Sequence, residues 1–159
     1  MKTILLATDG SPSARKATAT AVELAQATGA ALRVVTVWRV PVYSFGYVPV
    51  DWTPELIDAE RTHAHDVVEA AVNAAEDAGV SAIGLLRQGD PADEICEAAE
   101  THDADVIVIG AHGWGSLKRI VFGSVSTRVL HEAPCAVLVV RGVETVETDH
   151  EVRLEEAAS

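Results

Sequence analysis

A glycine-rich loop is the part of this sequence with the clearest chemical use. It follows the apolar run 106–109, and its spacing is Gly110-x2-Gly113-x9-Gly123-Ser124. Glycines let backbone N–H groups approach an anion without a Cβ in the way. A helical pattern begins at Ser124, and a helix N-terminus adds free N–H donors and a positive partial charge. Apolar run, glycine loop and helix, in this order, predict a phosphate-binding site.

The spacing of the glycines distinguishes this loop from two common phosphate motifs. The dinucleotide fingerprint needs three glycines within six residues, and the P-loop needs Gly-Lys-Ser/Thr after four spacer residues. Neither pattern is present between Gly110 and Ser124. The alternative interpretation is that the glycines serve only the geometry of turns.

Five apolar stretches alternate with four helical patterns along the chain, and they must position this loop. The expected strands cover 2–8, 31–37, 81–87, 106–109 and 135–140, and the expected helices begin near residues 12, 54, 91 and 124. This alternation predicts an α/β domain, a doubly wound five-stranded parallel sheet with helices on both faces. Such sheets bind ligands beyond the carboxyl ends of the strands, where the strand order reverses.

The composition restricts the classes of partner. Among 159 residues, 24 acidic side chains face 12 basic ones, giving a formal net charge of -12. This charge disfavours sequence-independent binding to nucleic acid or to an anionic membrane. No apolar run approaches the ~20 residues of a membrane span, so we expect a cytoplasmic protein without a targeting segment. Cys96 and Cys135 have neither metal nor redox spacing and are expected to be small core residues in a reducing compartment.

The acidic composition also raises the question of salt. Only three of the basic residues are lysines, a pattern that suits a salt-rich cytoplasm, although an ordinary acidic bacterial protein is the alternative. At molar salt the Debye length falls to ~3 Å and self-repulsion is relieved. For a halophilic protein the melting temperature should rise between low and molar KCl. A flat or falling melting temperature would remove the halophile hypothesis.

Three segments together resemble the ATP-binding branch of the universal stress protein family. The first apolar run ends in 7–11 (ATDGS), a turn at 89–91 (GDP) precedes a helix, and 123–125 (GSV) closes the glycine loop. The likeness covers residues 2–141, and the glycine loop is its most specific part. It implies an adenine nucleotide alpha-hydrolase-like fold with strand order 3-2-1-4-5, which places the first and fourth strands side by side.

The resemblance also implies which residues bind nucleotide. It places Ala7 and Asp9 near the adenosine and Val37 against the base. The expected ribose and phosphate contacts are Gly110, Ala111, Gly113, Gly123, Ser124 and Val125. Asp9 has two further interpretations, as a ligand of a divalent cation such as Mg or Mn and as an acid stabilised by a helix N-terminus.

Other polar residues of the loop have open roles. Lys118 and Arg119 offset phosphate charge in one interpretation and form a solvated face in the other. His112 contacts phosphate in one interpretation and makes a structural hydrogen bond within the loop in the other.

Three further segments have expected roles. The last strand, from Cys135 to Val140, has an apolar edge, and the family resemblance implies a homodimer paired through it. The domain is expected to cover 1–141, followed by an acidic, flexible tail at 142–159. The aromatic stretch 38–52 is interpreted as a flap, a lid or an interface.

The leading functional hypothesis is an ATP-binding regulatory or stress-response protein without robust catalysis, because no set of residues supplies a nucleophile and its base. The alternatives are a dimeric interaction module that does not bind nucleotide and a slow ATPase or nucleotidyl-transfer enzyme. Substituting Gly113 or Gly123 by valine should abolish nucleotide binding and leave the fold intact.

Overall fold

The computed structural model describes residues 1–40, 53–113 and 122–142. Residues 41–52, 114–121 and 143–159 lie outside the described residues. They include most of the aromatic stretch 38–52, Lys118, Arg119 and all of the predicted tail 142–159 except Gly142. The five strands are β1 (Thr3–Ala7), β2 (Ala31–Trp38), β3 (Ala82–Gln88), β4 (Val106–Gly110) and β5 (Ala136–Val140). The four helices are α1 (Pro12–Thr28), α2 (Pro54–Asp77), α3 (Pro91–Thr101) and α4 (Ser124–Glu132).

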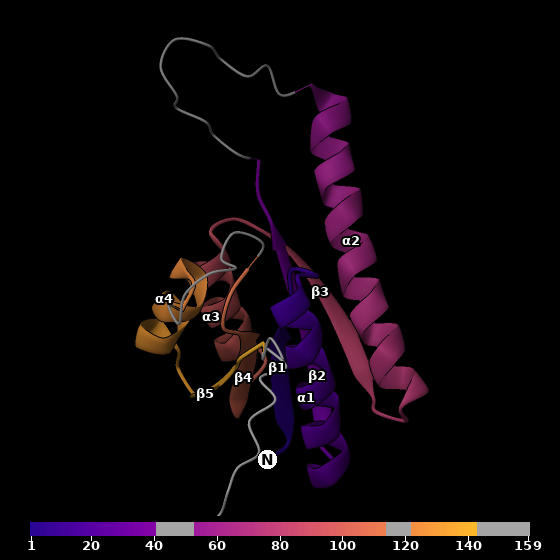
Figure 1. Cartoon of the computed structure of the whole chain (residues 1–159), viewed down its shortest axis with the longest axis vertical. Coiled ribbons are helices and arrows are strands. Elements are labelled where there is room, and N and C mark those ends of the chain that lie inside the picture. Colours follow the sequence, from indigo (N-terminus) through magenta and orange to yellow (C-terminus); the bar gives the residue numbers. More distant parts are fainter. Residues whose placement is uncertain (41–52, 114–121, 143–159) are drawn as a thin grey trace, which may run out of the picture.

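All five strands form one parallel sheet in the order β3-β2-β1-β4-β5 (Figure 1). The predicted fold class and strand order are therefore confirmed. Ala7, the last residue of β1, pairs with Val35 of β2 on one side and with Ile109 of β4 on the other. The strand order reverses between β1 and β4, so the carboxyl ends of these strands form the edge where a doubly wound sheet binds ligands.

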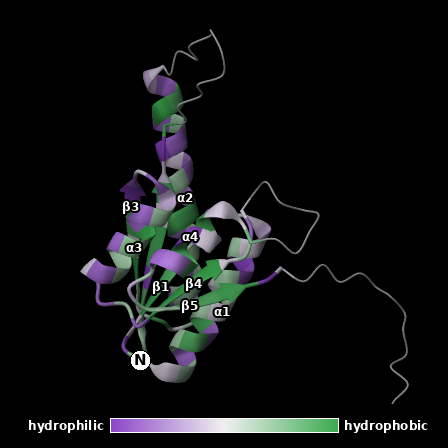
Figure 2. Ribbon diagram, turned by 90° about the vertical axis from the view of Figure 1, so that its left-hand side faces the viewer, coloured by the Kyte–Doolittle hydropathy of each residue, from purple (hydrophilic) through white to green (hydrophobic). Residues whose placement is uncertain are grey.

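The central strands of the sheet, β1 and β4, are buried between two helical layers. One core cluster joins Ile4 and Leu6 to α1 and α2, and the other joins Leu5 and Ala7 to α3 and α4. The helices accordingly lie as pairs on opposite faces of the sheet (Figure 1). Figure 2 shows the hydrophobic strands enclosed by helices whose outer sides are hydrophilic. Both faces of β1 are apolar because neither meets solvent.

Three of the helices begin with a side-chain cap. Ser11, Thr53 and Asp90 each accept a hydrogen bond from a backbone N–H of the first turn, and a proline follows each cap. These signals explain why the predicted helix starts agree with the structure. α1 ends at Gly29, whose φ of 69° is left-handed, as expected for a C-cap glycine.

The strand boundaries differ from the prediction by at most one residue at each end. β2 continues to Trp38, so the first residue of the aromatic stretch belongs to the sheet. Cys96 and Cys135 are half-buried free cysteines packed against the core of the α3–α4 face. Burial raises the pKa of both thiols. Among the described residues, none of the helices has the length and apolar character needed to cross a bilayer.

Asp105 ties the start of β1 to the start of β4 and predicts a pH-dependent stability. Its Oδ2 accepts hydrogen bonds from the backbone N–H of Lys2 at 2.5 Å and of Thr3 at 2.9 Å. The bond from Thr3, then that from Lys2, holds the pKa of Asp105 below its ordinary value of 3.8. A lowered pKa in the folded state adds stability above the unfolded value, and this is lost as pH falls through the folded pKa. Asp105→Asn should therefore be less stable than wild type at pH 7, with the difference shrinking below about pH 4.

Urea unfolding at a series of pH values measures this difference. Asp103→Asn is the control, because Asp103 lies in the same turn and asparagine tolerates its φ of 48°. A stability difference for Asp105→Asn that is constant from neutral pH to pH 2 would contradict the assignment.

Candidate functional site

A cavity of about 590 Å³ opens at the carboxyl ends of β1, β2 and β4. Its walls come from the strand ends, the start of α3, the glycine loop and the start of α4. The lining residues are Ala7, Thr8, Asp9, Ala14, Val35, Val37, Arg39, Pro91, Ile95, Ile109, Gly110, His112, Gly113, Phe122, Gly123, Ser124, Val125 and Ser126. A volume of this size is typical of pockets for cofactors and drug-sized ligands.

The structure brings eight of the nine predicted site residues to this cavity. They are Ala7, Asp9, Val37, Gly110, Gly113, Gly123, Ser124 and Val125. Ala111 is the exception, because it is 1% exposed and does not line the cavity. Its N–H donates to the carbonyl of Val140, and its carbonyl accepts from the N–H of Gly123. Ala111 thus joins β5 and the start of α4 to the end of β4.

One side of the cavity is apolar. Ala7, Val35 and Ile109 are buried residues of three neighbouring strands, and Val37 is partly buried beside them. Ile95 of α3 faces the same core cluster. A wall of aliphatic side chains is the environment in which a planar, weakly polar group such as a nucleobase loses its contact with water.

The glycine loop contributes backbone to the lining of the cavity. Gly113 has no room for a side chain directed at Asp9, since a Cβ there would lie 3.0 Å from Asp9 Oδ2. At Gly123 a Cβ would lie 3.6 Å from the carbonyl oxygen of Ala111, which is ordinary contact. Gly113 is therefore the tighter position of the two, while Gly123 has space for a methyl group.

The start of α4 differs from the other three helix starts. Gly123 is its N-cap, with φ -62° and ψ 160°, and no side chain caps the helix. Ser124, Val125 and Ser126, the first three residues of α4, all line the cavity. The first N–H groups of a helix have no partner within the helix and carry a partial positive charge. This end of the cavity is suited to an anion.

Gly110 has a packing role that the glycine spacing did not reveal. A Cβ at this position would lie 2.7 Å from Ser13 Oγ and 2.9 Å from the backbone carbon of Ser13 in α1. β4 can approach α1 this closely only without a side chain. Gly110→Ala should cost about 2–3 kcal/mol of unfolding free energy, or roughly 5–10 °C in melting temperature.

Thermal denaturation followed by circular dichroism measures the effect of Gly110→Ala. Gly142→Ala is the matched control, because no atom of the described residues lies within 4 Å of a Cβ there. Equal melting temperatures for the two variants would show that the close approach of β4 to α1 does not depend on glycine at position 110.

Asp9 follows β1 and takes part in a local turn. Its Oδ1 accepts a hydrogen bond from the N–H of Ser11 at 2.9 Å, and its Oδ2 lies next to Gly113, 3.0 Å from the position of a Cβ there. Asp9 therefore holds the turn before α1 and also lines the cavity. Asp9 is the carboxylate among the described lining residues.

Several lining residues were not among the predicted site residues. Arg39 lies directly after β2 and brings a cation to the cavity. Phe122 precedes the N-cap of α4, and the guanidinium of Arg141 lies 5.5 Å from its ring. Ser126 donates hydrogen bonds at 3.0 Å to the carbonyls of Ala111 and Gly123. A charged residue just after a buried strand was the available signal for Arg39, whereas the contacts of Arg141 with Phe122 and of Ser126 with Ala111 join residues more than ten positions apart.

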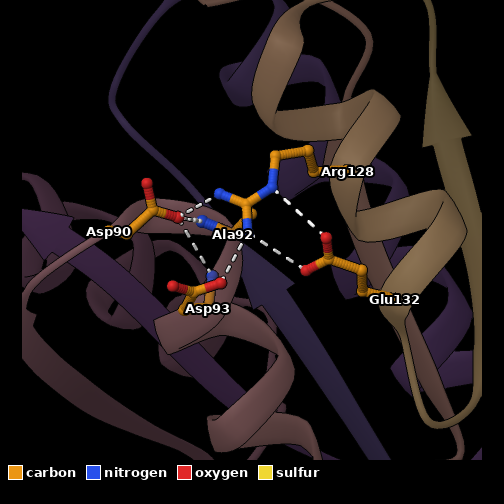
Figure 3. Close-up of polar contacts among 5 residues, drawn as sticks. All are labelled: Asp90, Ala92, Asp93, Arg128 and Glu132. Carbon is orange, nitrogen blue, oxygen red and sulfur yellow. Dashed lines mark hydrogen bonds and ion pairs between the residues drawn. The ribbon is translucent and has the colours of Figure 1, made fainter.

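An ion-pair cluster joins the two helices that carry cavity walls (Figure 3). Arg128 of α4 lies 2.6 Å from both Asp90 and Asp93 at the start of α3, and 3.2 Å from Glu132. The hydrogen bonds that Arg128 donates to Glu132, then to Asp93, raise the pKa of its guanidinium.

The N-cap Asp90 takes part in both the cluster and the start of α3. Burial alone would raise the pKa of Asp90, but the N–H of Asp93 and the guanidinium of Arg128 outweigh it and lower the pKa. These side chains are partly exposed, so the cluster fixes the relative position of α3 and α4 more than it adds stability.

Comparison with known proteins identifies the family. The family model described as the universal stress protein family matches residues 1–141. The chain belongs to the universal stress protein family. A universal stress protein of Thermus aquaticus is 42% identical over 142 residues, which cover 88% of this chain and 98% of the relative. One from Methanocaldococcus jannaschii is 36% identical over 141 residues, covering 88% of this chain and 82% of the relative.

Solved structures of universal stress proteins have the same fold. UspA from Lactobacillus plantarum superposes with a TM-score of 0.75 and 31% identity, covering 88% of this chain and 97% of that one. A universal stress protein from Archaeoglobus fulgidus, solved in complex with dAMP, gives a TM-score of 0.62 and 26% identity, covering 88% and 97%. The region matched by the family model, residues 1–141, includes the strand ends and helix starts that surround the cavity.

Proposed function

We propose that this universal stress protein binds ATP in the cavity at the carboxyl ends of β1, β2 and β4 and acts as a regulatory module. The observation that carries the proposal is the start of α4, which has no side-chain cap and faces the cavity beside the glycine loop. Phosphate oxygens bound there would accept hydrogen bonds from the N–H groups of Ser124 to Ser126. The hydroxyl of Ser124 would add another donor.

The apolar wall supports adenine as the base. Val35, Val37 and Ile95 would cover the faces of the ring, and Ala7 lies at the floor of the cavity. The Archaeoglobus fulgidus relative is a complex with dAMP, which has the same base. Arg39 supplies a positive charge, which favours a ligand with several phosphates.

Asp9 fits a metal that accompanies the phosphates. Mg²⁺ keeps several waters and binds through one or two carboxylates together with substrate phosphates. The Oδ2 of Asp9 lies next to Gly113 of the glycine loop and would be such a carboxylate. When bound, Mg or Mn would neutralise phosphate charge.

The described part of the cavity supports binding rather than turnover. The buried hydroxyl of Ser126 donates to the backbone carbonyls of Ala111 and Gly123, and His112 Nδ1 has no hydrogen-bond partner within the described residues. The two side chains therefore do not form the nucleophile–base pair that an acyl or phosphoryl transfer through serine needs. We accordingly propose a binding protein of the cytoplasm, paired as a homodimer through β5.

An ATP titration tests the proposal. Calorimetry with and without MgCl2 measures binding, and a phosphate-release assay on the same sample measures turnover. Binding with negligible phosphate release is the expected result. Rapid release would instead favour an enzyme, and the lack of any binding would favour an interaction module without nucleotide.

A further inference from the structure

His112 is a cavity residue whose ring has an unusual environment. It lies between Gly110 and Gly113, and its backbone is held against the start of α1. Its N–H donates to Ser13 Oγ at 3.4 Å, and its carbonyl accepts from Ser11 Oγ at 3.5 Å. These contacts fix the backbone and leave the imidazole without a role in holding the loop.

The imidazole has one nitrogen in the protein interior. Nδ1 is buried and has no hydrogen-bond partner within the described residues. His112 as a whole is only half-buried and lines the cavity. The edge of the ring that carries Nε2 is therefore the edge available to the cavity.

The environment of Nδ1 determines which nitrogen of the neutral ring carries the proton. A buried N–H without an acceptor is costly, and such orphaned N–H groups are rarer than under-satisfied acceptors. The neutral ring avoids this cost when Nδ1 is unprotonated and Nε2 carries the hydrogen. His112 then presents an N–H donor, not an acceptor, to the cavity.

The position of His112 relative to α4 indicates what accepts this hydrogen bond. Its Cα lies 3.7 Å from the position of a Cβ on Gly123, the N-cap of α4. Oxygen atoms of a phosphate held by the first N–H groups of α4 would lie at this end of the cavity. Phosphate oxygens are acceptors, so they match an N–H of His112 and would not match an unprotonated nitrogen.

We propose that His112 donates a hydrogen bond from Nε2 to a phosphate oxygen of the bound nucleotide and so selects phosphorylated ligands over the bare nucleoside. The inference rests on the proposed function and adds a specificity residue to it. The apolar wall around Val37 binds the base and does not distinguish AMP from adenosine. The donor of His112 makes that distinction together with the start of α4.

Three variants measured with two ligands test the proposal. His112→Phe keeps a ring but removes the donor, and His112→Gln keeps an N–H at the distance of Nε2. His112→Asn carries its amide at the distance of Nδ1, away from the cavity. Calorimetry with AMP and with adenosine should show that His112→Phe and His112→Asn lose about 10- to 100-fold in AMP affinity, the range of a hydrogen bond to a charged group. Adenosine affinity should change far less, and His112→Gln should keep most of the AMP affinity.

A second measurement does not require a ligand. Nitrogen-15 NMR of the free protein at mildly alkaline pH, where histidines are neutral, identifies which ring nitrogen is protonated. His112→Gln removes one of six histidine signals and so assigns the ring. The proposal requires the proton on Nε2, and a proton on Nδ1 would overturn it.

The outcomes separate this inference from the proposed function. If wild type binds neither AMP, ATP nor adenosine, nucleotide binding and the role of His112 both fail. If wild type binds AMP but His112→Phe loses AMP and adenosine equally, or loses neither, only the role of His112 fails.

Discussion

Replacing Gly123 with aspartate is expected to lower ATP affinity by at least about 100-fold without lowering the stability of the protein. Aspartate is among the best N-cap residues, and it would accept hydrogen bonds from the first N–H groups of α4. Those donors would then be occupied, and the carboxylate would repel phosphate. Losing two hydrogen bonds to a charged group, at about 1.5–3 kcal/mol each, accounts for a loss of this size.

The geometry around Gly123 makes this variant informative. A Cβ there would lie 3.6 Å or more from its nearest neighbours, and the φ of -62° is open to any residue. Gly123→Asp should therefore fold and melt at or slightly above the wild-type temperature. Binding and stability would then change in opposite directions, which a merely damaged fold cannot produce.

Gly123→Ala is the matched control. Its methyl group fits the same space, but it has no oxygen to cap α4, so it should lose up to about 1 kcal/mol of stability. In this variant the first N–H groups of α4 remain available to phosphate, and most of the ATP affinity should remain. Calorimetric titration and thermal melts of both variants give the comparison. Unchanged ATP affinity in Gly123→Asp would show that phosphate does not bind at the start of α4.

The architecture was accessible from the sequence because its signals are local. Ser11, Thr53 and Asp90 each precede a proline and an apolar helical pattern, so the predicted helix starts needed only a few neighbouring residues. Five apolar runs separated by helices indicated a parallel sheet. The strand order itself came from the family resemblance, since nothing in the periodicity states which strands are neighbours.

Parts of the site depended on distances that the sequence does not contain. Gly110 was predicted as a ligand-binding glycine, but its Cβ position falls on Ser13, almost a hundred residues earlier in the chain. Arg128 meets Asp90 and Asp93 only because α3 and α4 lie side by side on one face of the sheet. A spacing pattern identifies backbone that is free to bind, whereas long-range packing decides which residues also hold the structure together.

The second large effect is expected on dimerisation, from a substitution in the edge strand β5. β5 is a terminal strand, and Leu138 in its middle is 38% exposed. No charged residue interrupts β5 before Arg141, and no strand of the described residues pairs with its outer edge, so we expect this edge to pair with a second copy. Two copies related by a two-fold axis would align their β5 strands and bring the two Leu138 side chains close to the axis.

Leu138→Glu is expected to convert the proposed dimer into a monomer at micromolar concentration. Two carboxylates near one axis repel each other, and the exposed leucine surface that drives association is lost. Sedimentation velocity at several protein concentrations measures the change. Ile83→Glu is the matched control, because Ile83 is a 51% exposed residue of β3, the other edge strand. If both variants sediment like wild type, or if Ile83→Glu alone dissociates the dimer, then β5 is not the strand through which two copies pair.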